Sequence, residues 1–190
     1  MFASLKSLAP ALLCCALLAG CSSAPVMQQA RPVRETIDSF AFNGRLGVNL
    51  GNRAHSMRIS WEHMPRADLI GFSSPLGSQL ARLRRDAAGA SWETGDGERV
   101  EAASADELIA RLADVPVPVD ALALWVRGRV SVDAGVPEVD SLGRLLQASD
   151  QGWQVRVLTY ESELPNALPR IIEARQGEMK VRLVIEEWTL

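Results

Sequence analysis

The sequence predicts an α+β domain in which a strongly curved antiparallel sheet carries helices on its apolar side. Apolar and polar residues alternate along most of the chain, turns rich in Gly and Pro separate the alternating runs, and one helical stretch interrupts them. Nearly every predicted strand has one apolar face, which must be covered. We therefore expect the helices to lie over the concave, apolar side of the sheet.

The first strands form a meander. Apolar residues alternate from Phe42 to Leu50, the turn Gly51-Asn52 follows, and alternation resumes from His55 to Trp61. This pattern predicts a β-hairpin. Further short strands are predicted at 67–72, 79–84, 90–94 and 98–102.

Helical signals follow the meander. Ser104 and Glu107 match a capping box that starts a helix running to about residue 113, which Pro116 and Pro118 stop. A second helical piece, about 120–127, ends at Gly128. After an irregular stretch the sheet resumes, with strands predicted at 142–148, 153–157, 171–175 and 179–188.

The N-terminus has the layout of a lipoprotein signal. Lys6 precedes an apolar run that is too short to span a bilayer and ends in Leu18-Ala19-Gly20-Cys21. An ordinary secretory signal with an incidental cysteine is the alternative. We expect a signal peptide at 1–20, an acylated Cys21 with a flexible tether to residue 37, and one domain at 38–190. Ser22, rather than aspartate, after the cysteine favours the outer membrane, with the domain facing the periplasm.

Several classes of function are disfavoured. A net charge of −3 does not suit nucleic acid, and Arg82, Arg84 and Arg85 are predicted to form a solvated strand face. The glycines match neither a P-loop nor a dinucleotide fingerprint, and the chain has no G-x-S-x-G. His55 and His63 do not stand at metal-ligand spacing from carboxylates and are predicted to be structural. We expect no enzyme activity, cofactor, metal or nucleic-acid partner.

A series of short motifs, taken in order, resembles the LolB family. The motifs are Phe42-Asn43-Gly44-Arg45, Trp61, Ser74-Pro75-Leu76-Gly77-Ser78, Val115-Pro116-Val117-Pro118, Leu122, Trp125, Gly128, Gly152-Trp153, Tyr160 and Glu187-Trp188. The chain departs from the family at Asp114 and Val157. The resemblance implies an incomplete β-barrel, with a helical lid over an apolar cavity that accommodates acyl chains. It also implies that the protein receives lipoproteins from a LolA-like periplasmic carrier, binds these clients through their acyl chains and inserts them into the outer membrane.

Apolar residues of the strands and the second helix are the candidates for binding acyl chains. They are Phe42, Leu46, Val48, Met57, Ile59, Trp61, Leu122, Trp125, Leu183 and Ile185. Each of them could equally belong to a packed core, and periodicity does not separate the two roles. The alternative function is therefore a structural outer-membrane lipoprotein, an assembly-platform subunit without a ligand cavity.

Leu76 is the candidate membrane contact. It lies in a polar turn between two strands, where Pro75 and Gly77 suit adjacent turn positions, so the leucine is predicted to project from the tip. The family resemblance implies that this loop touches the membrane during insertion.

Overall fold

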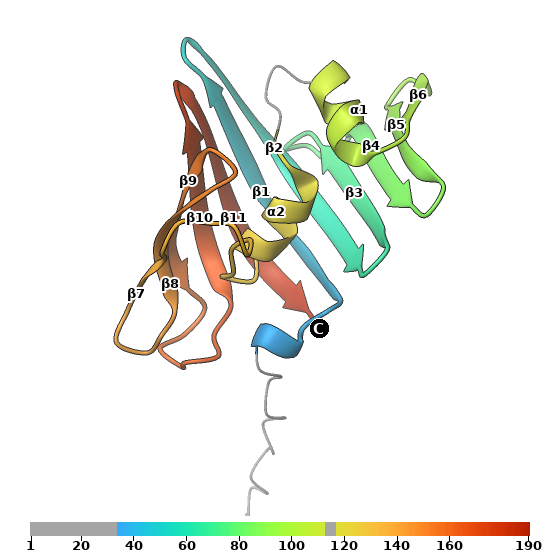
Figure 1. Cartoon of the computed structure of the whole chain (residues 1–190). Helices are drawn as coiled ribbons and strands as arrows, with labels where there is room; N and C mark the ends of the chain where they lie inside the picture. Colours follow the sequence, from blue (N-terminus) through green and yellow to red (C-terminus); the bar gives the residue numbers. More distant parts are fainter. Residues whose placement is uncertain (1–33, 113–116) are drawn as a thin grey trace, which may run out of the picture. The chain divides into compact units, whose positions relative to one another are not determined.

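Eleven strands form one antiparallel sheet in the computed structural model, which describes residues 34–112 and 117–190 (Figure 1). Their order is β6-β5-β4-β3-β2-β1-β11-β10-β9-β8-β7, so the first and last strands of the chain pair at the centre. The edge strands β6 and β7 do not pair with each other, and the sheet stays open. The predicted antiparallel sheet is confirmed.

The two halves of the sheet are each built from hairpins. A 3-10 turn, η1 (Arg34–Thr36), precedes the sheet. The first half contains β1 (Phe40–Leu50), β2 (Arg53–Met64), β3 (Ala67–Ser73), β4 (Gln79–Asp86), β5 (Gly89–Thr94) and β6 (Arg99–Ala102). The second half contains β7 (Glu138–Val139), β8 (Leu145–Asp150), β9 (Trp153–Tyr160), β10 (Pro169–Gln176) and β11 (Met179–Thr189).

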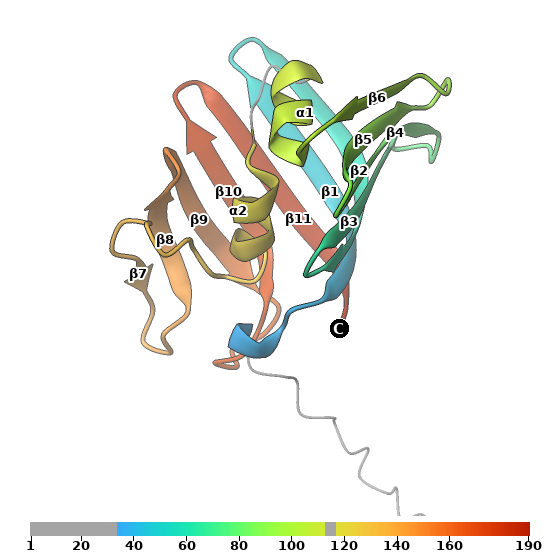
Figure 2. The same cartoon turned by 45° about the vertical axis from the view of Figure 1, so that its right-hand side comes forward.

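Two α-helices among the described residues lie on one side of the sheet. Helix α1 (Ala105–Leu112) packs against β4, β5 and β6, while α2 (Val119–Trp125) crosses the middle strands (Figures 1 and 2). The capping box forms, because Ser104 Oγ accepts a hydrogen bond from the Glu107 amide at 3.1 Å. Gly128, at φ 71°, caps the turn that follows α2. No helix among the described residues is long and apolar enough to cross a membrane.

Gly44 marks the point where β1 approaches β11 most closely. A Cβ atom there would lie 2.3 Å from the carbonyl oxygen of Val184, so no other residue fits without a shift of the backbone. The pairing of β1 with β11 also slips by one residue between Asn43 and Gly44. A bulge of this kind bends a strand and increases its twist, which helps to curve the sheet around the helical side.

Several element boundaries differ from the predictions by two or three residues, and one short strand was not predicted. Strand β8 begins at Leu145 rather than Leu142, because Asp140 Oδ1 accepts hydrogen bonds from the amides of Leu142 and Arg144 and holds these residues in a turn. The two-residue strand β7 lies in a stretch that was predicted to be irregular. None of these differences alters the sheet on which the candidate site lies.

Candidate functional site

The concave face is filled by aromatic rings at one end. Phe42 pairs in register with Trp61 on one side and Trp188 on the other, with ring centroids 5.8 and 5.3 Å apart. Phe40 packs edge-on against Trp61 at 5.6 Å. Phe40, Phe42 and Trp61 are at most 4% exposed, so this end is a closed core.

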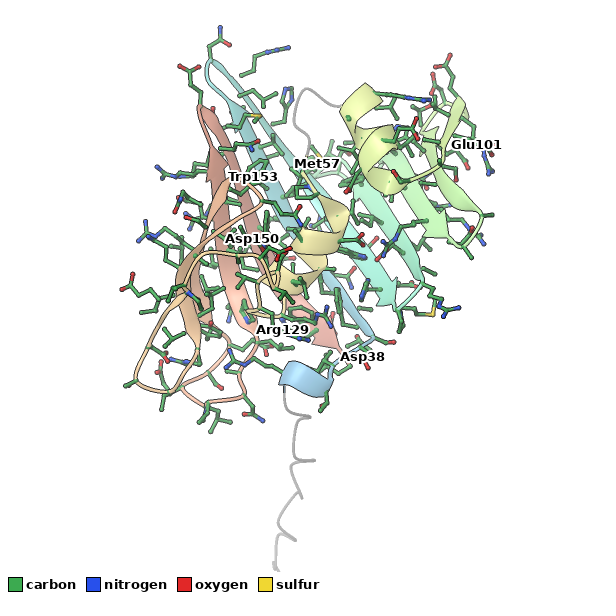
Figure 3. The ribbon with its side chains drawn as sticks, viewed as in Figure 1. Asp38, Met57, Glu101, Arg129, Asp150 and Trp153 are labelled. Atoms are coloured by element: carbon green, nitrogen blue, oxygen red, sulfur yellow. The ribbon has the colours of Figure 1, made fainter. Side chains whose placement is uncertain are left out.

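The same face is only partly covered nearer the β1–β2 and β10–β11 turns. Met57, Leu46 and Leu183 form one row across β2, β1 and β11. Leu183 is buried, but Met57 and Leu46 are only half-buried, as are Leu50 and Met179 in the row closest to the turns. Figure 3 labels Met57 above α2, between this helix and the end of the sheet that carries the β1–β2 turn. We call this half-buried region the open end of the concave face.

Three surface hollows are found among the described residues, and one of them borders the open end at Met179. The first, of about 170 Å³, lies along β4, β5 and β6. The second, of about 490 Å³, lies between the β1–β2 and β10–β11 turns. The third, of about 230 Å³, lies over Leu69, Arg82 and Glu93. None of the three is lined by a residue predicted to bind acyl chains. The predicted apolar cavity under the helices is not confirmed, and the candidate site is the partly covered apolar surface at the open end.

A buried carboxylate on β3 holds the arginine that pairs with the start of α2. Asp68 Oδ1 accepts a hydrogen bond from Trp61 Nε1 at 2.8 Å and lies 2.6 Å from His63 Nδ1. Its other oxygen pairs with Arg85, which also pairs with Asp120 in the first turn of α2. Burial opposes ionisation of Asp68, but the hydrogen bonds from His63 and Trp61 and the charge of Arg85 outweigh it and lower the pKa of Asp68.

A second buried carboxylate holds the end of α2. Asp150 Oδ2 accepts hydrogen bonds from Trp125 Nε1 at 2.7 Å and from the Ser131 amide at 2.9 Å. Figure 3 shows Asp150 beside α2. The ring of Trp125 also packs on the ring of Trp153, with ring centroids 6.2 Å apart. Just beyond the helix, Arg127 donates hydrogen bonds to the carbonyls of Ala123 and Ile37. Helix α2 is thus fixed to the sheet at both ends.

The structure divides the predicted acyl-chain residues into two groups. Six lie in the closed core, at most 4% exposed: Phe42, Ile59, Trp61, Trp125, Leu183 and Ile185. Four are half-buried: Leu46, Val48, Met57 and Leu122. The half-buried strand residues are the ones that a ligand could reach without displacing the core.

The loop between β3 and β4 displays Leu76. The Gly77 amide donates to the Ser74 carbonyl at 2.9 Å and the Ser74 amide to the Ser78 carbonyl at 2.8 Å, which closes the loop into a tight turn. Gly77, at φ 93°, occupies a conformation that favours glycine. Leu76 is 97% exposed, so the predicted projection of this side chain is confirmed. Cys21 and the signal segment lie outside the described residues.

Sequence reasoning missed the buried charged groups. Arg85 was wrongly grouped with the solvated arginines, since its side chain is 20% exposed and pairs with Asp68. His63 is buried and structural, as predicted, but its carboxylate partner was not foreseen. Asp68 stands two residues before the inward-facing Ile70, and this polar residue at a core position was the available signal. Among the described residues, no group of three or more His, Cys, Asp or Glu side chains could hold a metal ion.

Comparison with known proteins identifies the family. The family model described as "Outer membrane lipoprotein LolB" matches residues 38–188. The chain belongs to the LolB family. It is 36% identical to the outer-membrane lipoprotein LolB of Azoarcus sp. over 92% of this chain and 91% of that protein. It is 34% identical to LolB of Dechloromonas aromatica over 93% and 94% of the two chains, and 29% identical to LolB of Vibrio cholerae over 100% and 99%.

Solved structures extend the likeness to the fold. A LolA superfamily protein from Nitrosomonas europaea matches with a TM-score of 0.53 and 10% identity, over 83% of this chain and 88% of that one. A DUF1329 family protein from Desulfovibrio piger matches with a TM-score of 0.53 over 82% and 86%. As a LolB protein, the chain is a lipid-anchored outer-membrane lipoprotein that faces the periplasm, and its family and fold support a role in lipoprotein localisation.

Proposed function

We propose that this LolB protein receives lipoproteins from a LolA-like periplasmic carrier and inserts them into the outer membrane, holding their acyl chains against the open end of the concave face. The observation that carries the proposal is the half-burial of Leu46, Val48 and Met57 on a face whose other end is a closed core. These side chains offer apolar contact to a ligand at the surface of the domain.

The chemistry of the cargo explains why such a surface is needed. A mature lipoprotein carries about three acyl chains, and exposing them to water costs on the order of 30 kcal/mol at about 0.8 kcal/mol per methylene. Transfer must therefore run from one apolar environment to the next. Methionine suits such a site because its unbranched side chain adapts to irregular partners, and both Met57 and Met179 lie at the open end.

Two further parts belong to this proposal. The acyl groups on Cys21 would anchor the chain, and the tether would let the domain reach away from the membrane surface. Leu76, at the tip of the β3–β4 loop, would enter the bilayer when cargo is released. The handover needs no nucleotide, because successive environments of rising affinity for acyl chains supply its direction.

The alternative is an assembly-platform subunit with a packed core. The six predicted acyl-chain residues that lie in the closed core favour this reading, and so does the absence of the predicted residues from the three hollows. If the protein is an assembly-platform subunit, the open end binds no ligand. A single substitution there separates the two functions.

The test is Met57→Glu, with Met64→Glu as the matched control. Met57 is half-buried on the concave face, whereas Met64, on the same strand, is 53% exposed. A carboxylate at residue 57 would meet acyl carbons and should lower acceptance from a loaded LolA-like carrier by tenfold or more, roughly the cost of an unpaired polar group in an apolar contact. Met64→Glu should accept normally. Circular dichroism establishes that both variants are folded, and normal acceptance by folded Met57→Glu would refute lipid binding at the open end.

A further inference from the structure

Basic side chains gather on the opposite, convex face of the sheet. Six of them lie on five neighbouring strands, β2, β1, β11, β10 and β9, and we call them the basic patch: Arg45, Arg58, Arg156, Arg175, Lys180 and Arg182. Two carboxylates pair with members of the patch, Glu173 and Glu186. The patch therefore has an excess of positive charge in a chain whose net charge is −3.

Glu173 holds part of the patch in place. It is 4% exposed and its carboxylate lies 2.7 Å from Arg175, 2.8 Å from Lys180 and 3.7 Å from Arg182. In the sheet register it stands between Arg182 on β11 and Arg156 on β9. Burial raises the pKa of Glu173, but hydrogen bonds from Lys180 and Arg175 outweigh it and lower the pKa, so the glutamate stays ionised and orders the cations.

Two features of the patch cost stability. Arg45 lies directly opposite Arg58 in the pairing of β1 with β2, and like charges in register destabilise a sheet. Gly47 lies between Ser56 and Arg182, although its backbone does not require glycine and the nearest atom to an added Cβ would be 3.8 Å away. A strand glycine without a structural need often marks a close approach by a ligand. Residues that reduce the stability of a sheet, as the Arg45–Arg58 pair and Gly47 do, are expected where the surface has a binding function.

We propose that the basic patch binds the phosphate groups of anionic phospholipids, and so holds the anchored domain against the inner leaflet of the outer membrane. The lipid anchor of a LolB protein keeps this membrane surface at high effective concentration, which makes lipid the favoured anionic partner. The bare backbone at Gly47 lets headgroups approach between Arg45 and Arg182. Because the patch and the concave face lie on opposite sides of the sheet, docking through the patch directs the concave face toward the periplasm.

The test measures how closely the convex face approaches lipid headgroups. The acylated protein, carrying a fluorophore at Ser56→Cys, is reconstituted into vesicles of phosphatidylethanolamine with either phosphatidylglycerol or phosphatidylcholine, together with a headgroup-labelled quencher lipid. Ser56 is exposed and pairs in register with Gly47, so the fluorophore lies at the centre of the patch. Quenching should be strong only with phosphatidylglycerol, and 0.5 M salt should abolish it.

Charge reversal within and outside the patch completes the design. Arg45→Glu with Arg182→Glu should weaken docking by about tenfold or more, since each basic residue near an anionic membrane contributes on the order of 1 kcal/mol. Arg66→Glu with Arg111→Glu changes the charge equally, at exposed residues of the β2–β3 turn and of helix α1 rather than on the convex face, and should have no effect. Equal quenching in both lipid mixtures, or equal losses in both double variants, would overturn the proposal. The assay contains no carrier or client, so its outcome is independent of the transfer test.

Discussion

Leu76→Glu should separate the final insertion step from every earlier one. The side chain is 97% exposed, so the substitution removes almost no buried area and should change the free energy of unfolding by no more than about 0.5 kcal/mol. Burying one leucine in the bilayer contributes roughly 1.5 to 3 kcal/mol, which corresponds to about 10- to 150-fold in an equilibrium constant. A carboxylate gives up this contribution and adds a penalty for entering the hydrocarbon.

The assay follows a client lipoprotein from a loaded carrier into vesicles that contain the reconstituted protein. We expect Leu76→Glu to accept the client as the unmodified protein does, while the fraction integrated into the bilayer falls at least about tenfold. Leu164→Glu is the matched control, because Leu164 is 59% exposed and lies in the loop between β9 and β10. Unimpaired integration by folded, anchored Leu76→Glu would refute the reasoning, as would an equal defect in Leu164→Glu.

Four further outcomes are expected. Cys21→Ala should remove the lipid and release the protein from the membrane, and palmitate label that persists on the variant would contradict acylation at this residue. Asp68→Ala should lower the free energy of unfolding by about 3 kcal/mol, measured in urea, by leaving Arg85 without its buried partner. Because the pKa of Asp68 is lowered, its stabilisation is present above its unfolded pKa of about 3.9 and is lost as the pH falls through the folded value, so Asp68→Asn should show a shallower acid transition. Gly44→Ala should cost about 1–3 kcal/mol, because its Cβ would collide with the Val184 carbonyl, and an unchanged urea midpoint would argue against this close approach.

Local patterns in the sequence were enough to predict most of the sheet. Alternation with a two-residue turn predicted the β1–β2 hairpin, and the pairing of Phe42 with Trp61 places both on the concave face as the alternation requires. The capping box at Ser104 likewise fixed the start of α1. Both signals depend on residues that are close together in the sequence, so they can be recognised without knowledge of the fold.

Features that depend on distant residues could not be predicted in the same way. Arg85 contacts Asp120 across 35 positions of sequence, and nothing in the pattern around Arg85 distinguishes it from the exposed Arg84. Within β2, Met57 and Ile59 have the same alternation, yet one is half-buried and the other 4% exposed. Periodicity assigns a face of the sheet, but the position of α2 decides which part of that face is covered.

The way α2 is held bears on how cargo could pass through the protein. Separating the helix from the sheet would break the hydrogen bond from Trp125 to the buried Asp150, and leaving a buried polar group without its partner costs about 1–3 kcal/mol. Under the proposed function, we therefore expect acyl chains to rest at the open end, beside Met57, without lifting α2. A chain held against a half-covered surface keeps more contact with water than one in a bilayer, so its affinity for the protein is lower than for the membrane. This difference would drive cargo onward without an energy source, and it predicts that covering the open end more completely would slow release while strengthening acceptance.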